Sequence, residues 1–204
     1  MVTDRPYVLG LTGSIGMGKS TVARMFRDQG IPVWDADGAV HRLYARGGAG
    51  VAQIAALRPE AVRDGEVSRP ALRAWIAEDP GALERIEKAI HPLVAADRSD
   101  FLAGADAADE PLVVLDIPLL FETGGERFVD AVLVVTAPAE LQRDRVLARS
   151  GITEADFERL LAKQMSDAEK RARADYIVQS IELEPTRQSV QALIGHLRER
   201  NGHA

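Results

Sequence analysis

The sequence predicts an α/β fold, in which a doubly wound, five-stranded parallel sheet carries a helical insert and a helical lid. Three observations lead to this prediction. Short apolar runs alternate with amphipathic segments, a glycine-rich segment follows the first run, and the strand rhythm stops between residues 47 and 108. Continuous apolar runs are typical of strands that are buried on both faces, as in parallel sheets with helical crossovers.

Five apolar runs predict the strands of this sheet. Four are at residues 7–12, 31–34, 112–115 and 131–135, and a shorter fifth is at 176–178. Helical patterns at 20–28, 38–46, 138–149 and 186–200 alternate with them. Parallel strands joined in this way have right-handed crossovers, and their ligands bind beyond the carboxyl ends of the strands. We therefore expect the functional residues where strands end.

The composition is that of an ordinary globular chain of 204 residues, with 46% apolar and 27% charged residues. The absence of cysteine excludes disulfides, thiolate metal sites and thiol nucleophiles. A net charge of −6 without a long basic run argues against nucleic acid as a partner. Because residues 1–6 lack signal-peptide features and no apolar stretch reaches the about 20 residues that span a bilayer, we expect no membrane partner and a cytoplasmic location.

The most informative motif is GSIGMGKS at residues 13–20, which completes the pattern G-x-x-x-x-G-K-[ST] between a predicted strand and a predicted helix. Its glycines allow backbone N–H groups to surround an anion, and the helix start and Lys19 add positive charge. Ser20 is placed to offer its hydroxyl to a magnesium ion. We predict a nucleoside triphosphate site formed by Gly13, Ser14, Ile15, Gly16, Met17, Gly18, Lys19, Ser20 and Thr21.

Around this loop the chain is expected to form one domain, residues 1–204, with three kinds of subregion. Residues 1–46, 109–140 and 174–204 form the nucleotide-binding core. Residues 47–108, with a glycine-rich joint at 47–50 and helical patterns at 69–89 and 92–104, form a substrate-holding insert. Residues 141–173 contain two capping-box patterns, which predict short helices joined by hinges, an arrangement typical of a lid.

Two aspartates follow predicted strands. Asp116 ends the run at 112–115, where a second magnesium-ordering carboxylate is expected beside a phosphate loop; the alternative is an aspartate that caps a strand end. Asp37 opens a predicted helix after the second strand. It could accept a hydrogen bond from an attacking hydroxyl, as a kinase aspartate does, or cap the helix, and the two roles are not exclusive.

Arg145 and Arg149 are four residues apart, so both are expected on one helix face, where they form either a phosphate clamp or a solvated basic face. His91 precedes Pro92 and is expected at a helix start, without a partner at the spacing of a zinc site. His41 follows Asp37 by four residues and is expected on the same face. The chain lacks the Asn-Lys-x-Asp run typical of GTPases, which favours a small-molecule kinase.

These residues closely resemble one family, dephospho-coenzyme A kinase. The resemblance rests on the run from Gly10 into the loop, DADGAVH at 35–41, IHP at 90–92, DIPLLFE at 116–122, and Gln142 followed by Arg145, Arg149 and Gln164. It extends from about residue 8 to about residue 195. It implies transfer of the γ-phosphoryl group of ATP to the ribose 3′-hydroxyl of dephospho-CoA, the last step of coenzyme A synthesis.

The resemblance also implies roles for the residues. Asp37 becomes the expected catalytic base, and Lys19, Arg145 and Arg149 act on the transferred phosphate. ATP and Mg²⁺ are the expected cofactors, with the ion held by Ser20 and Asp116. The expected contacts with dephospho-CoA are Asp35, Asp37, His41, His91 and Glu122.

Two alternatives remain: another small-molecule or nucleoside monophosphate kinase of related fold, and a non-enzymatic nucleotide switch. A monomer fits the sequence, which does not predict an oligomeric state.

Overall fold

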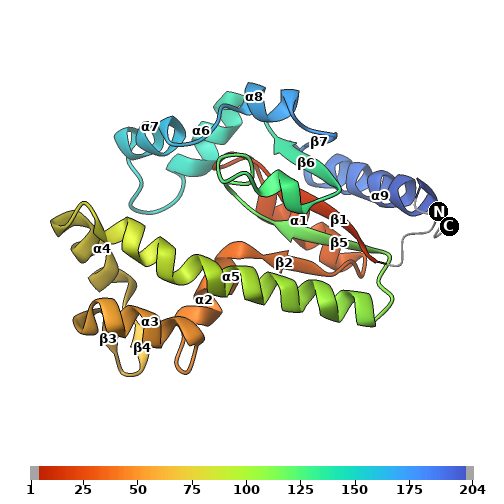
Figure 1. Ribbon diagram of the computed structural model, residues 1–204. Coiled ribbons are helices and arrows are strands. Elements are labelled where there is room, and N and C mark those ends of the chain that lie inside the picture. Colours follow the sequence, from red (N-terminus) through yellow and green to blue (C-terminus); the bar gives the residue numbers. More distant parts are fainter. Residues whose placement is uncertain (1–4, 201–204) are drawn as a thin grey trace. The chain divides into compact units, whose positions relative to one another are not determined.

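The computed structural model describes residues 5–200 (Figure 1). The expectation that the chain lacks a signal peptide rests partly on residues 1–4, which lie outside the described residues. The chain divides into two compact units, one formed by the residues up to 34 together with those from 105 onward, and the other by residues 35–104. Within the described residues, no helix combines the length and the apolar character that a membrane span requires.

The first unit is built on a five-stranded sheet in the order β2-β5-β1-β6-β7, which confirms the predicted fold class. Neighbouring strands run parallel, and the central strand places Leu11 opposite Asp116 and Thr12 opposite Val134. The strands are β1 (Tyr7–Thr12), β2 (Val33–Asp35), β5 (Leu112–Asp116), β6 (Ala131–Thr136) and β7 (Tyr176–Gln179).

Both faces of this sheet are buried, as the apolar runs predicted. Residues 131, 133 and 135 of β6 pack in the core that includes helices α1 (Lys19–Asp28) and α9 (Leu183–Arg200). Residues 132 and 134 pack instead with Leu120 and Phe121. Figure 1 shows α9 beside the β7 edge of the sheet.

Four short helices complete the first unit. They are η2 (Gly125–Phe128), α6 (Ala139–Leu147), α7 (Glu154–Ala162) and α8 (Asp167–Ala172). α7 and α8 each begin with a capping box, in which Thr153 or Ser166 exchanges hydrogen bonds with the residue three positions later. The sequence patterns at these two positions are thus confirmed.

The second unit is mainly helical and has its own apolar core, to which Leu43, Ile54, Trp75 and Ile86 belong. Its elements are α2 (Ala36–Tyr44), α3 (Ala49–Leu57), η1 (Pro59–Ala61), β3 (Val62–Arg63), β4 (Glu66–Val67), α4 (Arg69–Glu78) and most of α5 (Ala82–Ala107). The short antiparallel hairpin of β3 and β4 was not predicted from the sequence.

α5 also differs from the prediction, because it runs without a break across Pro92, where two separate helices were expected to meet. A proline inside a helix removes one backbone hydrogen bond. Ile86 and Ile90 before it are buried in the core of the second unit, and Leu93 after it packs against the same core. Burial of this continuous apolar face outweighs the lost hydrogen bond.

Candidate active site

The loop between β1 and α1 has the backbone that a phosphate loop requires. Gly16 and Gly18 have φ angles of 79° and 91°, in the left-handed region that favours glycine. A Cβ atom at Gly16 would lie 2.6 Å from Val146 Cγ2 and 2.8 Å from the Gln142 carbonyl oxygen, so a side chain is also excluded by space. Gly18 is the N-cap of α1 and gives it no side-chain cap, which leaves the positive end of the helix suited to an anion.

Two predicted site residues meet beside this loop. Lys19 Nζ lies 2.5 Å from Asp116 Oδ1, and Asp116 is only 3% exposed. The parallel pairing of β1 with β5 places Asp116 level with Leu11, close to where the loop begins. Ser20 is exposed on the first turn of α1, and Thr21 beside it is half-buried. The ammonium group and the carboxylate predicted for phosphate and magnesium therefore belong to one site.

Arg145 lies on α6 next to the loop. A Cβ atom at Gly18 would come 3.5 Å from Arg145 Nη1, and this nitrogen is buried without a hydrogen-bond partner. Its other terminal nitrogen, Nη2, donates to the Ile181 carbonyl oxygen at 3.3 Å. Because a buried charged donor without an acceptor is costly, this nitrogen marks a position suited to an anion.

Arg149 was predicted inside the same helix, but α6 ends at Leu147. Arg149 is exposed, and within residues 5–200 its side chain forms no hydrogen bond or ion pair. The structure thus brings Arg145 to the loop and leaves Arg149 in solvent beyond the end of α6.

Two glutamines hold the loop at Ile15. Gln142 Nε2 donates to the Ile15 carbonyl oxygen at 2.7 Å, and the Ile15 N–H donates to Gln164 Oε1 at 3.0 Å. The loop is held again at Met17, whose sulfur accepts a hydrogen bond from the Ala137 N–H. Both glutamines belong to the family motif quoted above, but the residues alone predicted no role for them.

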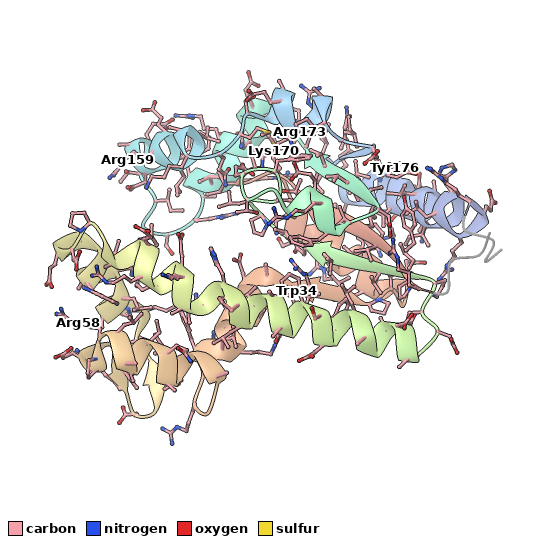
Figure 2. All side chains as sticks on the ribbon, in the orientation of Figure 1. Trp34, Arg58, Arg159, Lys170, Arg173 and Tyr176 are labelled. Carbon is pink, nitrogen blue, oxygen red and sulfur yellow. The ribbon has the colours of Figure 1, made fainter. Side chains whose placement is uncertain are left out.

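Glu122 forms an ion pair with Lys170 of α8, at 2.7 Å, and also accepts the Met165 N–H at 2.8 Å. Burial raises the pKa of Glu122, but the hydrogen bonds from Lys170 and Met165 outweigh it and leave the pKa below its ordinary value. Lys170, which is labelled in Figure 2, is on α8. Its exposed fraction is 0%, although a lysine in a short polar helix looks like a surface residue in the sequence. Sequence reasoning therefore missed it.

In the second unit, Asp35 and Asp37 are distinguished by their hydrogen bonds. Asp35 is the N-cap of α2, and its Oδ1 accepts the N–H groups of Asp37 at 3.0 Å and Gly38 at 3.2 Å. The capping alternative for Asp37 is therefore wrong, because Asp35 already occupies that role. The Asp37 side chain is on the first turn of the helix, where it is not enclosed by the core.

The two predicted histidines are also on helices of the second unit. His41 lies on α2, four residues after Asp37, and is exposed. His91 is exposed on α5, and the expectation that it begins a helix is wrong because α5 continues through it. In the described part of the chain, no three imidazole or carboxylate groups gather as a metal site.

A phosphate loop that leaves the central strand of a parallel sheet, with a lysine, a carboxylate and an arginine around it, defines a P-loop nucleotide-binding protein. The comparisons with known proteins go further. The family model described as dephospho-CoA kinase matches residues 7–183. The chain therefore belongs to the dephospho-CoA kinase family.

Individual relatives agree with the family match. A dephospho-CoA kinase of Cereibacter sphaeroides is 60% identical over 195 residues, which cover 96% of this chain and 98% of the relative. The crystal structure of TT1252 from Thermus thermophilus is 36% identical, with a TM-score of 0.81 over 95% of this chain and 98% of that one. A dephospho-CoA kinase structure from Campylobacter jejuni, at 20% identity and a TM-score of 0.67 over 94% and 97%, shares the fold.

Membership confirms the resemblance that the motifs indicated. It also confirms the predicted function, that of a dephospho-CoA kinase, and with it the ATP-dependent kinase activity.

Proposed function

We propose that this chain transfers the γ-phosphoryl group of Mg²⁺-bound ATP to the ribose 3′-hydroxyl of dephospho-CoA, giving coenzyme A and ADP. The observation that carries the proposal is the family match over residues 7–183, within which the phosphate loop is intact. In phosphoryl transfer the protein mainly aligns the groups and neutralises charge, so each residue is assigned by those two tasks.

The nucleotide phosphates bind the backbone N–H groups of residues 13–20 and the uncapped start of α1. Two features support this assignment: the positive φ angles of Gly16 and Gly18, and the absence of a side-chain cap at Gly18. Lys19 supplies the charge next to the transferred group. Its contact with Asp116 holds the ammonium group in place at the loop.

The residues present fit a magnesium ion. Ser20 offers an exposed hydroxyl and Asp116 a carboxylate, and oxygen ligands are what Mg²⁺ prefers. Magnesium in kinases is commonly held by one or two protein oxygens together with phosphate oxygens, which agrees with a site that has so few protein ligands. When bound, the ion neutralises charge on the phosphates and orients them.

Arg145 and Arg149 are assigned to the charge that develops during transfer. The buried Nη1 of Arg145, next to Gly18 and without an acceptor, supports its part in this role. Arg149 follows four residues later, and its exposed guanidinium is unengaged by the described residues. We assign it to a lid formed by residues 141–173 that closes over the nucleotide.

Asp37 is assigned to the acceptor hydroxyl. Since Asp35 caps α2, the carboxylate of Asp37 remains able to orient the 3′-hydroxyl and to take its proton as the bond to phosphorus forms. Asp35, His41, His91 and Glu122 complete the proposed contacts with dephospho-CoA. The insert of residues 47–108 is proposed to hold the remainder of that substrate.

A panel of acceptors tests the proposal. The purified chain is incubated with Mg²⁺-ATP and with dephospho-CoA, AMP, shikimate or no acceptor, and release of ADP is measured. We expect dephospho-CoA to raise the rate by on the order of 10² or more over the sample without acceptor, and EDTA to abolish the increase. A preference for AMP or shikimate would assign the chain to another kinase, and slow acceptor-independent hydrolysis would favour a nucleotide switch.

A further inference from the structure

The backbone of Ile15 in the phosphate loop is held at both its N–H and its C=O by side chains that come from distant parts of the chain. Gln142 donates to its carbonyl oxygen, and Gln164 accepts its N–H. Gln142 is nearly fully buried, so its position is fixed by packing. Gln164 lies between α7 and α8, outside any helix, and its position needs another explanation.

The residue after Gln164 supplies that explanation. The Met165 N–H donates to Glu122 Oε1, and the same oxygen accepts a hydrogen bond from Lys170 Nζ. Since Lys170 is fully buried, its ammonium group cannot exchange this partner for water. A charged hydrogen bond fixes direction as well as distance, which apolar packing does not. The Glu122 carboxylate is therefore a fixed anchor for the segment that carries Gln164.

The segment that ends with Glu122 also contains Asp116, which lies at the nucleotide site. Glu122 ends the segment that begins at Asp116, and Asp116 pairs with Lys19 of the phosphate loop. The segment 116–122 therefore contacts the start of α1 through Asp116, and through Glu122 it contacts the segment whose glutamine holds Ile15.

We propose that Gln164 is a positioning residue for the phosphate loop, and that the ion pair of Glu122 with the buried Lys170 holds Gln164 at the backbone of Ile15. This inference deepens the proposed function and rests on it. It assigns Glu122 to the nucleotide side of the reaction through Gln164, in addition to the acceptor-side role that the family resemblance implies. It also gives the buried lysine a part in nucleotide binding without contact with the substrate.

The first test compares Gln164→Ala with Gln188→Ala, a matched change at an exposed glutamine of α9. Calorimetry measures binding of Mg²⁺ with a non-hydrolysable ATP analogue, and separately of dephospho-CoA. We expect Gln164→Ala to weaken binding of the analogue by about 3- to 12-fold, the effect of one hydrogen bond, and to change dephospho-CoA binding less than about twofold. Gln188→Ala should change neither.

Hydrogen exchange of the Ile15 amide, followed by NMR without nucleotide, tests the same contact directly. We expect Gln164→Ala to speed this exchange by on the order of tenfold, because the amide loses its acceptor. An unchanged exchange rate, with analogue affinity equal to that of the original chain, would overturn the inference. If the original chain itself fails to bind the analogue, the proposed function fails, and the exchange rate still decides whether Gln164 positions Ile15.

The second test addresses the ion pair with Glu122→Gln and Lys170→Met, each checked for folding by circular dichroism. Each single variant should weaken binding of the analogue and speed exchange of the Ile15 amide. When either change is combined with Gln164→Ala, the double variant should bind the analogue no more than about twofold more weakly than Gln164→Ala alone. If Lys170→Met fails to fold, Glu122→Gln, which keeps an acceptor for Met165, carries the test. A change confined to dephospho-CoA binding in Glu122→Gln would overturn the role of the ion pair.

Discussion

Asp35 and Asp37 lie two residues apart at the start of one helix, yet their hydrogen bonds separate their roles. Asp35 Oδ1 accepts two backbone N–H groups of the first turn, one of which is the N–H of Asp37, whereas the Asp37 side chain is exposed. A capping side chain acts on the stability of the helix, and an uncommitted carboxylate beside it is available for chemistry. We therefore expect loss of the Asp35 side chain to lower the stability of the fold, and loss of the Asp37 carboxylate to lower turnover.

Asp35→Ala should lower the free energy of unfolding by about 1 kcal/mol, because two N–H groups of α2 lose their acceptor. Urea unfolding measures the change, with Asp37→Ala as the matched control. The control should stay within about 0.5 kcal/mol of the original chain, as expected for a side chain outside the cap and the core. Equal losses for both variants would contradict this division of roles.

Asp37→Asn should reduce kcat by on the order of 10² or more and leave ATP binding nearly unchanged, since the amide cannot take the proton of the acceptor hydroxyl. Asp100→Asn, at an exposed position of α5, serves as the control and should keep full activity. Steady-state kinetics and calorimetry with the ATP analogue measure the two quantities. A loss of ATP affinity as large as the loss of kcat would contradict the assignment.

At the scale of elements, the phosphate loop is shaped by its neighbours as well as by its own glycines. Gly16 faces Val146 and the Gln142 backbone of α6. Gly30, after α1, has a similar φ of 76°, but a Cβ atom there would have no neighbour within 4 Å. The comparison of these two glycines separates backbone strain from close packing.

Gly30→Ala should destabilise the chain by about 1 kcal/mol, the cost of a left-handed backbone with a side chain, and leave nucleotide binding intact. Gly16→Ala should cost more, because its Cβ also collides with α6, and should weaken nucleotide binding by about tenfold or more. Thermal unfolding and analogue titration measure both effects. Equal behaviour of the two variants would show that contact with α6 does not shape the loop.

The elements also show what the sequence pattern can predict. Strand and helix positions around the loop were predictable to within a few residues, because buried apolar runs and amphipathic periods act locally. The continuity of α5 was not predictable from the sequence. Pro92 indicates locally that a helix ends, but burial of Ile86 and Ile90 in the core outweighs this local preference. The β3 and β4 hairpin was missed because two-residue strands have no measurable period.

The candidate site was predictable to a similar extent. Lys19 belongs to the local motif of the phosphate loop, and Asp116 lies at the end of an apolar strand. Both features are recognisable in the sequence. The contacts of Gln142 and Gln164 with Ile15 join residues more than a hundred positions apart, and no local pattern encodes them. Lys170 is buried, although the polar sequence around it predicts exposure. Its ion pair with Glu122 is apparent only from the fold.

At the scale of the whole molecule, two carboxylates in ion pairs link stability to pH. Burial raises the pKa of Asp130, but hydrogen bonds from Arg5 and from the Val8 N–H outweigh it, so the pKa falls below its ordinary value of 3.8. The pKa of Glu122 is likewise below its ordinary value of 4.5. A carboxylate with a lowered folded-state pKa stabilises the fold above its ordinary pKa, and this contribution is lost as the pH falls through the lower value.

Stability should therefore be steady near neutral pH and decline once the pH drops below about 4.5, the ordinary pKa of the Glu122 side chain. Glu122→Gln should make the decline shallower, since the amide does not titrate. Urea unfolding at a series of pH values measures the slope, and Glu87→Gln, at an exposed glutamate of α5, is the control that should leave it unchanged. An identical slope in Glu122→Gln would contradict the contribution of this carboxylate.

The most direct test of the whole account is mass spectrometry of dephospho-CoA after incubation with Mg²⁺-ATP and the purified chain, beside a Lys19→Ala sample. The account predicts a product heavier by one phosphate, absent with Lys19→Ala, and NMR should place that phosphate on the ribose 3′ position. Unchanged dephospho-CoA in the presence of a chain that binds ATP would contradict the central claim, as would the same product formed by Lys19→Ala at the original rate.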